Sequence, residues 1–207
     1  MSGRRPEAPD GIAYVFGYGS LVTMKEEVTL AGRPWAAVPG RLRDHRRNWG
    51  AAMNNWEAGP LEKHFVDPDS GEQPRIRVAY LDIDERPGAT VNGLAIPADS
   101  RRLAEIDVRE VNYLRVDVTA AFEPALPHPV FTYRATDAAR ERCRRHYPQP
   151  EVFVSRDYVA AVRRAFAALG EGQLEEYERT TEPLDFPQRH LRLVYPPPAQ
   201  GESEPRY

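Results

Sequence analysis

Cysteine is almost absent from this chain, in which Cys143 is the only one. A single cysteine cannot form an internal disulfide, so the sequence excludes a disulfide-stabilised scaffold and fits a reducing cytoplasm. Cys143 stands among arginines on an expected helix. A catalytic thiol is conceivable there, but we do not assign Cys143 as a nucleophile.

Long hydrophobic runs are also missing. No apolar stretch approaches the roughly 20 residues needed to cross a bilayer. The first ten residues carry basic side chains with no hydrophobic region after them, so they do not have the pattern of a signal peptide. The sequence therefore predicts a cytoplasmic protein without a membrane partner.

Signals for metal and nucleic acid are lacking as well. None of the five histidines falls at metal-ligand spacing. Lys25 and Lys63 are the only lysines among 28 basic residues, which we attribute to genomic base composition. The net charge is −3, and acids are interspersed with the arginines of 41–47 and 140–145. We expect no metal, no cofactor and no nucleic-acid partner.

The composition that remains, 41% hydrophobic and 29% charged over 207 residues, is typical of one soluble globular domain. We place this domain at residues 12–195, between polar, proline-rich tails at 1–11 and 196–207. Strands are predicted at 12–16, 75–83, 91–96, 113–118 and 130–133, and a long loop or lid at 54–74. Residues 75–83 alternate like a half-buried strand, with Ile76, Val78 and Tyr80 on one face.

Two helices are expected. Asp99 or Ser100 can cap the first, which runs toward Glu110. Ser155 can cap the second, and Gly170 stands where a left-handed C-terminal cap belongs. Many strands with few helices favour an α+β fold, a small mixed β-barrel with flanking helices.

The stretch from Tyr14 to Leu21, YVFGYGSL, is the most informative in the chain. A short apolar strand leads into a loop with two glycines, whose missing Cβ atoms let backbone amides approach a ligand closely. Successive amides from such a turn can converge on a carboxylate or carbonyl oxygen. The stretch predicts a loop that cradles an anion at the end of a strand.

Three segments together resemble the gamma-glutamylcyclotransferase-like family. The loop FGYGSL at 16–21 is similar to the family's substrate loop. The stretch with Arg109 and Glu110, followed by Tyr113, resembles the segment of its catalytic glutamate. The third match, SRDY at 155–158, opens a helix followed by LEEY at 174–177. Order and spacing agree over roughly residues 12 to 183, and VPGRL at 38–42 resembles the family's second strand.

The resemblance implies an enzyme that releases 5-oxoproline from a small γ-glutamyl substrate without a cofactor. Glu110 would be the catalytic general acid/base. The substrate-binding residues would be Tyr18, Gly19, Ser20, Leu21, Tyr113 and Tyr158, with Tyr133 a weaker candidate. Glutathione, γ-glutamyl amino acids and a γ-glutamyl biosynthetic intermediate all remain open as substrates.

Two features leave alternatives open. Val111 and Asn112 stand where relatives often have glycine, so the turn after Glu110 can differ. The basic segment 41–47 fits either a solvated strand edge or a rim that attracts a second substrate carboxylate. A non-catalytic small-molecule binding or interaction module on the same fold is the alternative to an enzyme, because a fold alone does not establish activity.

Overall fold

The computed structural model describes residues 11–57, 63–144 and 151–195. The predicted tails lie outside these residues apart from Gly11. The strands are β1 (Ile12–Gly17), β2 (Val28–Leu30), β3 (Arg33–Trp35), β4 (Val38–Asn54), β5 (His64–Val66), β6 (Arg77–Asp99), β7 (Tyr113–Asp117), β8 (Phe122–Glu123), β9 (Val130–Ala135), β10 (Val152–Ser155), β11 (Gln188–Arg189) and β12 (Arg192–Val194). The helices are α1 (Ser100–Arg109), α2 (Asp137–Cys143), α3 (Arg156–Ala167) and α4 (Gln173–Thr180), with the 3-10 turns η1 (Ser20–Met24) and η2 (Thr119–Ala121).

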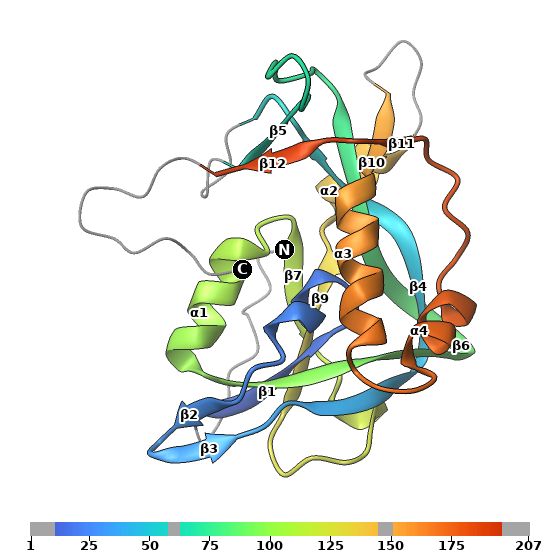
Figure 1. Ribbon diagram of the computed structural model, residues 1–207. Helices are drawn as coiled ribbons and strands as arrows, with labels where there is room; N and C mark the ends of the chain where they lie inside the picture. The colour runs from blue at the N-terminus through green and yellow to red at the C-terminus, as the bar shows by residue number, and fades with distance from the viewer. Residues whose placement is uncertain (1–10, 58–62, 145–150, 196–207) are drawn as a thin grey trace.

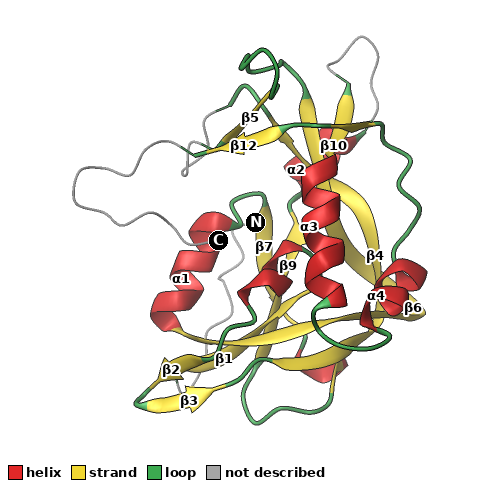
Figure 2. Cartoon of the chain, in the orientation of Figure 1, coloured by secondary structure: helices red, strands yellow, loops and turns green. Residues whose placement is uncertain are grey.

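One eight-stranded mixed sheet forms the centre of the molecule (Figure 1). Its order is β11-β10-β6-β1-β9-β7, and β4 pairs with both β6 and β8. β1 is antiparallel to β6 and parallel to β9. The sheet is curled but open, with α3 lying across it and α1 standing beside it (Figure 2). The predicted α+β fold with flanking helices is therefore confirmed, as a half-barrel.

The strands predicted at 75–83 and 91–96 are one continuous strand, β6. The charged, Pro- and Gly-containing stretch between them looks like a turn in the sequence. In the structure it is an irregularity in the long pairing of β6 with β4, where the register shifts between Arg43 and His45. Asp44 and Gly88 both have positive φ there, and the Asp44 carboxylate accepts the Gly88 amide at 2.8 Å. A side-chain hydrogen bond thus carries the strand pair through the kink.

β6 is also more deeply buried than a half-buried strand. Val78, Ala79, Leu81, Asp82 and Ile83 are all buried, so both faces are covered in this part of the strand. The alternation seen in the sequence fails here because other elements pack on both sides of the sheet. As a result, consecutive residues of β6 line two different hollows, described below.

Both predicted helix starts are confirmed. The Asp99 carboxylate caps α1 by accepting the Arg102 amide at 2.8 Å. The Ser155 hydroxyl caps α3 by accepting the Tyr158 amide at 3.4 Å. The predicted end of α3 is displaced, because the C-cap is Ala168 in a right-handed conformation and Gly170, with positive φ, lies two residues beyond.

The predicted loop at 54–74 contains a strand. β5 pairs antiparallel with β12 in a separate two-stranded sheet, and residues 58–62 lie outside the described part. Local composition gave no sign of this strand because its partner is more than a hundred residues away. Within the described residues, no helix is long and apolar enough to cross a membrane.

Candidate functional site

Three segments far apart in the sequence meet at one pocket. They are the loop after β1, the turn between α1 and β7, and the first turn of α3. In Figure 1 the blue helical turn after β1 lies between α1 and α3. The pocket is lined by Tyr18, Gly19, Ser20, Leu21, Leu81, Glu110, Tyr113, Tyr133 and Tyr158. Every site residue predicted from the sequence is in this group.

Close packing of backbone positions the glycine loop. A Cβ on Gly93 of β6 would lie only 2.2 Å from the Gly17 carbonyl oxygen, so β6 passes directly against the end of β1. The chain then turns into η1, where the Val22 amide donates to the Gly19 carbonyl. The first amides of such a helical turn have no acceptor inside it. The amides of Ser20 and Leu21 are at this position and can donate hydrogen bonds to an oxygen atom of a bound ligand.

Glu110 occupies the predicted boundary between helix and strand. Its amide closes α1 by donating to the Ile106 carbonyl at 2.8 Å, and its own carbonyl accepts the Tyr113 amide at 2.8 Å. Only 15% of its side chain is exposed. Burial raises the pKa of this carboxyl above its ordinary value of 4.5, while the positive charges of Arg109 and Lys63 oppose the rise. A raised pKa makes this carboxyl a better proton acceptor than an exposed glutamate once it is ionised.

Three of the tyrosine hydroxyls donate hydrogen bonds within the protein, and the hydroxyl of Tyr158 is the candidate donor to a ligand. The Tyr18 hydroxyl donates to the Tyr133 carbonyl at 2.6 Å, and the Tyr113 hydroxyl donates to the Leu81 carbonyl at 2.7 Å. The Tyr133 hydroxyl donates to Asp107 at 2.6 Å. Burial raises the pKa of Tyr158, and the Leu81 amide hydrogen-bonds its oxygen. Tyr158 therefore stays protonated at neutral pH and can donate to a ligand.

The pocket is small in this structure. It encloses about 30 Å³, whereas pockets for small molecules commonly measure about 300 Å³ or more. A bound ligand must therefore push lining side chains apart. The pocket is narrow at Gly19, since a Cβ there would lie 3.3 Å from the Tyr158 hydroxyl and 3.4 Å from Leu81 Cδ1.

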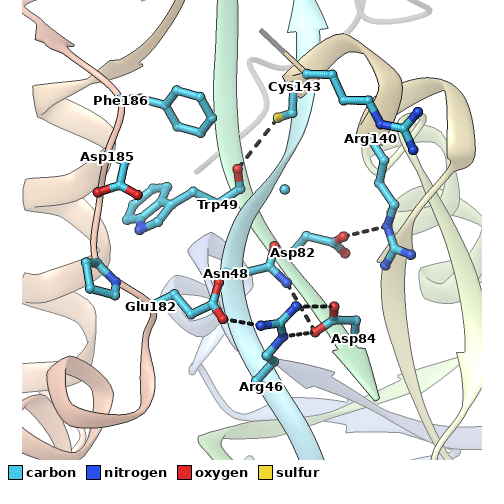
Figure 3. Close-up of a pocket in the computed structure, with 13 residues that line it drawn as sticks. Arg46, Asn48, Trp49, Asp82, Asp84, Arg140, Cys143, Glu182, Asp185 and Phe186 are labelled. Carbon is cyan, nitrogen blue, oxygen red and sulfur yellow. Dashed lines mark hydrogen bonds and ion pairs between the residues drawn. The ribbon is translucent and has the colours of Figure 1, made fainter. Parts of the chain in front are cut away.

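A larger hollow of about 770 Å³ lies elsewhere, at the edge of β4 (Figure 3). It shares no lining residue with the Glu110 pocket. Its charged side chains are largely neutralised by one another: Arg46 pairs with Asp84 and Glu182, and Arg140 pairs with Asp82 at 2.8 Å. A largely buried carboxyl beside the first residues of a helical turn favours the smaller pocket as the candidate functional site.

Cys143 lines the larger hollow and not the Glu110 pocket. Its thiol lies 3.6 Å from the Trp49 carbonyl oxygen, and burial raises its pKa to about 12. The thiolate is the reactive form of cysteine, so this buried thiol is inert at neutral pH. Within the described residues, no group of three or more His, Cys, Asp or Glu side chains could hold a metal ion.

Comparison with solved structures identifies the fold. The sequence matches no family model and no curated protein. A crystal structure of uncharacterized protein loc79017 from Homo sapiens aligns with a TM-score of 0.50 at 15% identity, covering 87% of this chain and 94% of that one. The chain shares the fold of that protein. A structure described as gamma-glutamyl cyclotransferase aligns at 0.48 and 14% identity, over 86% of this chain and 93% of that one. YkqA from Bacillus subtilis aligns at 0.49 and 16%, over 86% of this chain and 56% of that one. Likeness at this identity shows the fold, and the reaction has to be inferred from the site.

Three residues around Glu110 were not among the site residues predicted from the sequence. Leu81 lines the pocket from β6, on the face that the alternation pattern assigned to solvent. Arg109 lies 3.3 Å from the Glu110 carboxylate. Lys63 is near enough to lower the pKa of Glu110. Adjacency in the sequence indicates a pairing of Arg109 with Glu110, but nothing local marks Lys63.

The arginine segment 41–47 does not form a rim of this pocket. β4 is paired on both sides at Arg41, which also binds Glu176 in a bidentate ion pair. Arg43 and Arg46 pair with other acids, and Arg47 is fully buried. None of these four lines the Glu110 pocket. Both interpretations made from the sequence, a solvated edge and a carboxylate rim, are wrong for Arg47.

Proposed function

We propose that this protein is a gamma-glutamyl cyclotransferase, with Glu110 as its general acid/base. The observation that carries the proposal is a largely buried carboxyl of raised pKa that lines one pocket with Gly19, Ser20 and Leu21, where the η1 turn begins. Intramolecular aminolysis needs one proton-transfer group and donors for a developing oxyanion. The pocket offers both.

In the proposed reaction, the α-amine of a γ-glutamyl group attacks its own γ-carbonyl carbon. Glu110 takes a proton from the nitrogen as the new C–N bond forms, and the Ser20 and Leu21 amides stabilise the oxyanion. Collapse breaks the original amide bond, and Glu110 returns the proton to the leaving nitrogen. The products are 5-oxoproline and a free amine, and no water is consumed. Holding the substrate folded supplies much of the acceleration, since oriented intramolecular reactions reach effective molarities of about 10⁵–10⁸ M.

The test is a substrate panel. Purified protein is incubated with glutathione, γ-glutamyl-alanine and a γ-glutamyl amine, and 5-oxoproline is quantified by mass spectrometry. Release from at least one substrate supports the proposal. If none yields 5-oxoproline but one binds in calorimetry, the protein is a binding module on the same fold.

The pH dependence should reflect the burial of Glu110. The carboxyl must be ionised to accept the first proton, and burial raises its pKa above 4.5. We therefore expect kcat/KM to fall as the pH drops through this raised value, above the range of an exposed glutamate. A kcat/KM profile between pH 4 and 9 measures the acidic limb. An acidic limb centred at or below the pKa range of an exposed glutamate would contradict the role of Glu110.

Gly19→Ala should hinder the entry of the substrate into the pocket. The Cβ of an alanine at this position would crowd Tyr158 and Leu81. We expect kcat/KM to drop by about 10- to 200-fold, the effect typical of one extra carbon in a tight site. Steady-state kinetics measure this drop, and a thermal melt checks that the variant is folded. An unchanged kcat/KM would mean that the substrate does not approach Gly19.

A further inference from the structure

Arg109 joins the two halves of the pocket. Its Nε lies 3.3 Å from Oε1 of Glu110, on the turn after α1. Its Nη2 donates to the Ser20 hydroxyl and its Nη1 to the Met24 sulfur, each at 3.5 Å. Ser20 and Met24 both belong to η1, the turn that would hold the substrate oxygen. One guanidinium thus contacts the proton-transfer group and the amide-bearing turn, which lie some 89 residues apart in sequence.

We propose that Arg109 is a positioning residue, which fixes the Glu110 carboxylate at a set distance from the η1 turn. The guanidinium is a rigid planar fork, so its contacts constrain direction as well as separation. Arg109 is suited to this positioning role because only 20% of its side chain is exposed. The inference rests on the proposed function, in which the proton must move between atoms held by these two segments.

The charge of Arg109 acts on the same carboxylate. The groups that couple to Glu110 are Arg109 at the end of α1 and Lys63 before β5, together with the buried hydroxyls of Tyr18, Tyr80, Tyr113, Tyr133 and Tyr158. Arg109 is the larger of the two cationic influences that lower the pKa of Glu110. Removing it should therefore move this pKa upward, while a lysine in its place should keep most of the charge effect.

Two variants separate position from charge. Arg109→Met removes both the positioning contacts and the charge. We expect kcat to fall on the order of 10²-fold, the loss typical when a catalytic group is misplaced by about 1 Å. The acidic limb of the kcat/KM profile should also shift to higher pH. Arg109→Lys keeps the charge but not the fork, so kcat should still fall while the limb stays near its wild-type position. KM should change little in either. Arg101→Met, on an 84% exposed side chain of the same helix, is the matched control and should behave like wild type.

A second readout does not depend on turnover. The protein is labelled with ¹³C at the glutamate carboxyls, and the Glu110 resonance is assigned by its loss in Glu110→Gln. Its titration should shift upward in Arg109→Met and not in Arg101→Met. Unchanged kcat and unchanged titration in Arg109→Met would overturn the inference, and so would full rescue of kcat by lysine. If wild type releases no 5-oxoproline, the proposed function fails, whereas the titration still decides whether Arg109 acts on Glu110. Arg109→Lys carries the kinetic test if the methionine variant does not fold.

Discussion

Turnover of a γ-glutamyl substrate is expected to fall about 10²–10⁴-fold when Glu110 is replaced by glutamine, the range typical of general acid–base catalysis. Glutamine keeps the shape of the side chain but cannot accept the proton from the attacking amine. The loss should appear in kcat, measured as 5-oxoproline release under substrate saturation. Turnover within a few-fold of wild type would remove Glu110 from the mechanism.

The same substitution should not weaken the fold at neutral pH. Burial raises the pKa of Glu110 in the folded state, so the folded protein holds this proton more tightly than the unfolded chain does. The charged carboxyl therefore costs stability, increasingly as the pH rises from the unfolded-state pKa of about 4.3 to the raised folded-state value, and constantly above it. Glu110→Gln should unfold at higher denaturant concentration than wild type at pH 7, with the difference vanishing below about pH 4.

A matched control lies on the same helix. Glu105 is 60% exposed and forms a 3.9 Å ion pair with Arg101. Glu105→Gln should leave both turnover and stability close to wild type, because exposed ion pairs contribute about 1 kcal/mol or less. A parallel loss of activity in both variants would point to a general disturbance of α1 and not to proton transfer at position 110.

The site residues were predicted from the resemblance to a known family, and local signals in the sequence account for the elements that carry them. Asp99 and Ser155 cap their helices through their own side chains, so residue type alone marks where α1 and α3 begin. The turn at Gly19 follows from glycine placed after a compact apolar strand. These short-range features placed Glu110 and Tyr158 at the ends of elements that lead into the pocket.

Features that depend on distant partners were not predictable. β6 appears as two strands because the stretch 84–90 is polar, and its continuity depends on pairing with β4 and on the Asp44 bond to Gly88. Lys63 reaches Glu110 from a segment that looks like a plain loop. Arg47 sits in a run of basic residues with nothing to distinguish it, and its burial depends on side chains about 120–130 residues further along the chain.

Arg47→Ala is expected to lower the free energy of unfolding by about 3 kcal/mol or more, because it leaves buried acceptors unpaired and opens a cavity. The Arg47 side chain is fully buried. Its Nη1 donates to the Tyr177 carbonyl at 3.2 Å and to the Thr181 hydroxyl at 2.9 Å, and its Nη2 donates to Asn92. The guanidinium also lies over the rings of Phe166 and Tyr177, at 5.0 and 4.6 Å.

Burying the charge of Arg47 costs free energy, which opposes the stabilisation that these contacts provide. Burial lowers the pKa of Arg47 to about 10, so the side chain stays charged at neutral pH. Hydrogen bonds to charged groups are each worth about 1.5–3 kcal/mol, and Arg47 donates to four residues, Asn92, Tyr177, Thr180 and Thr181. Removing the side chain would leave these buried acceptors unpaired and open a cavity, so Arg47→Ala should destabilise the fold.

Thermal unfolding measures the result. In a chain of this size a loss of 3 kcal/mol corresponds to a Tm lower by about 6–12 °C. Arg43→Ala is the control, since its 49% exposed side chain pairs with a 57% exposed Glu123, and it should cost about 1 kcal/mol or less. Arg47→Met refills the space between Phe166 and Tyr177 but leaves the acceptors unpaired, so it should recover only part of the loss. Equal stability of the methionine variant and wild type would show that packing, and not hydrogen bonding, is what the buried arginine contributes.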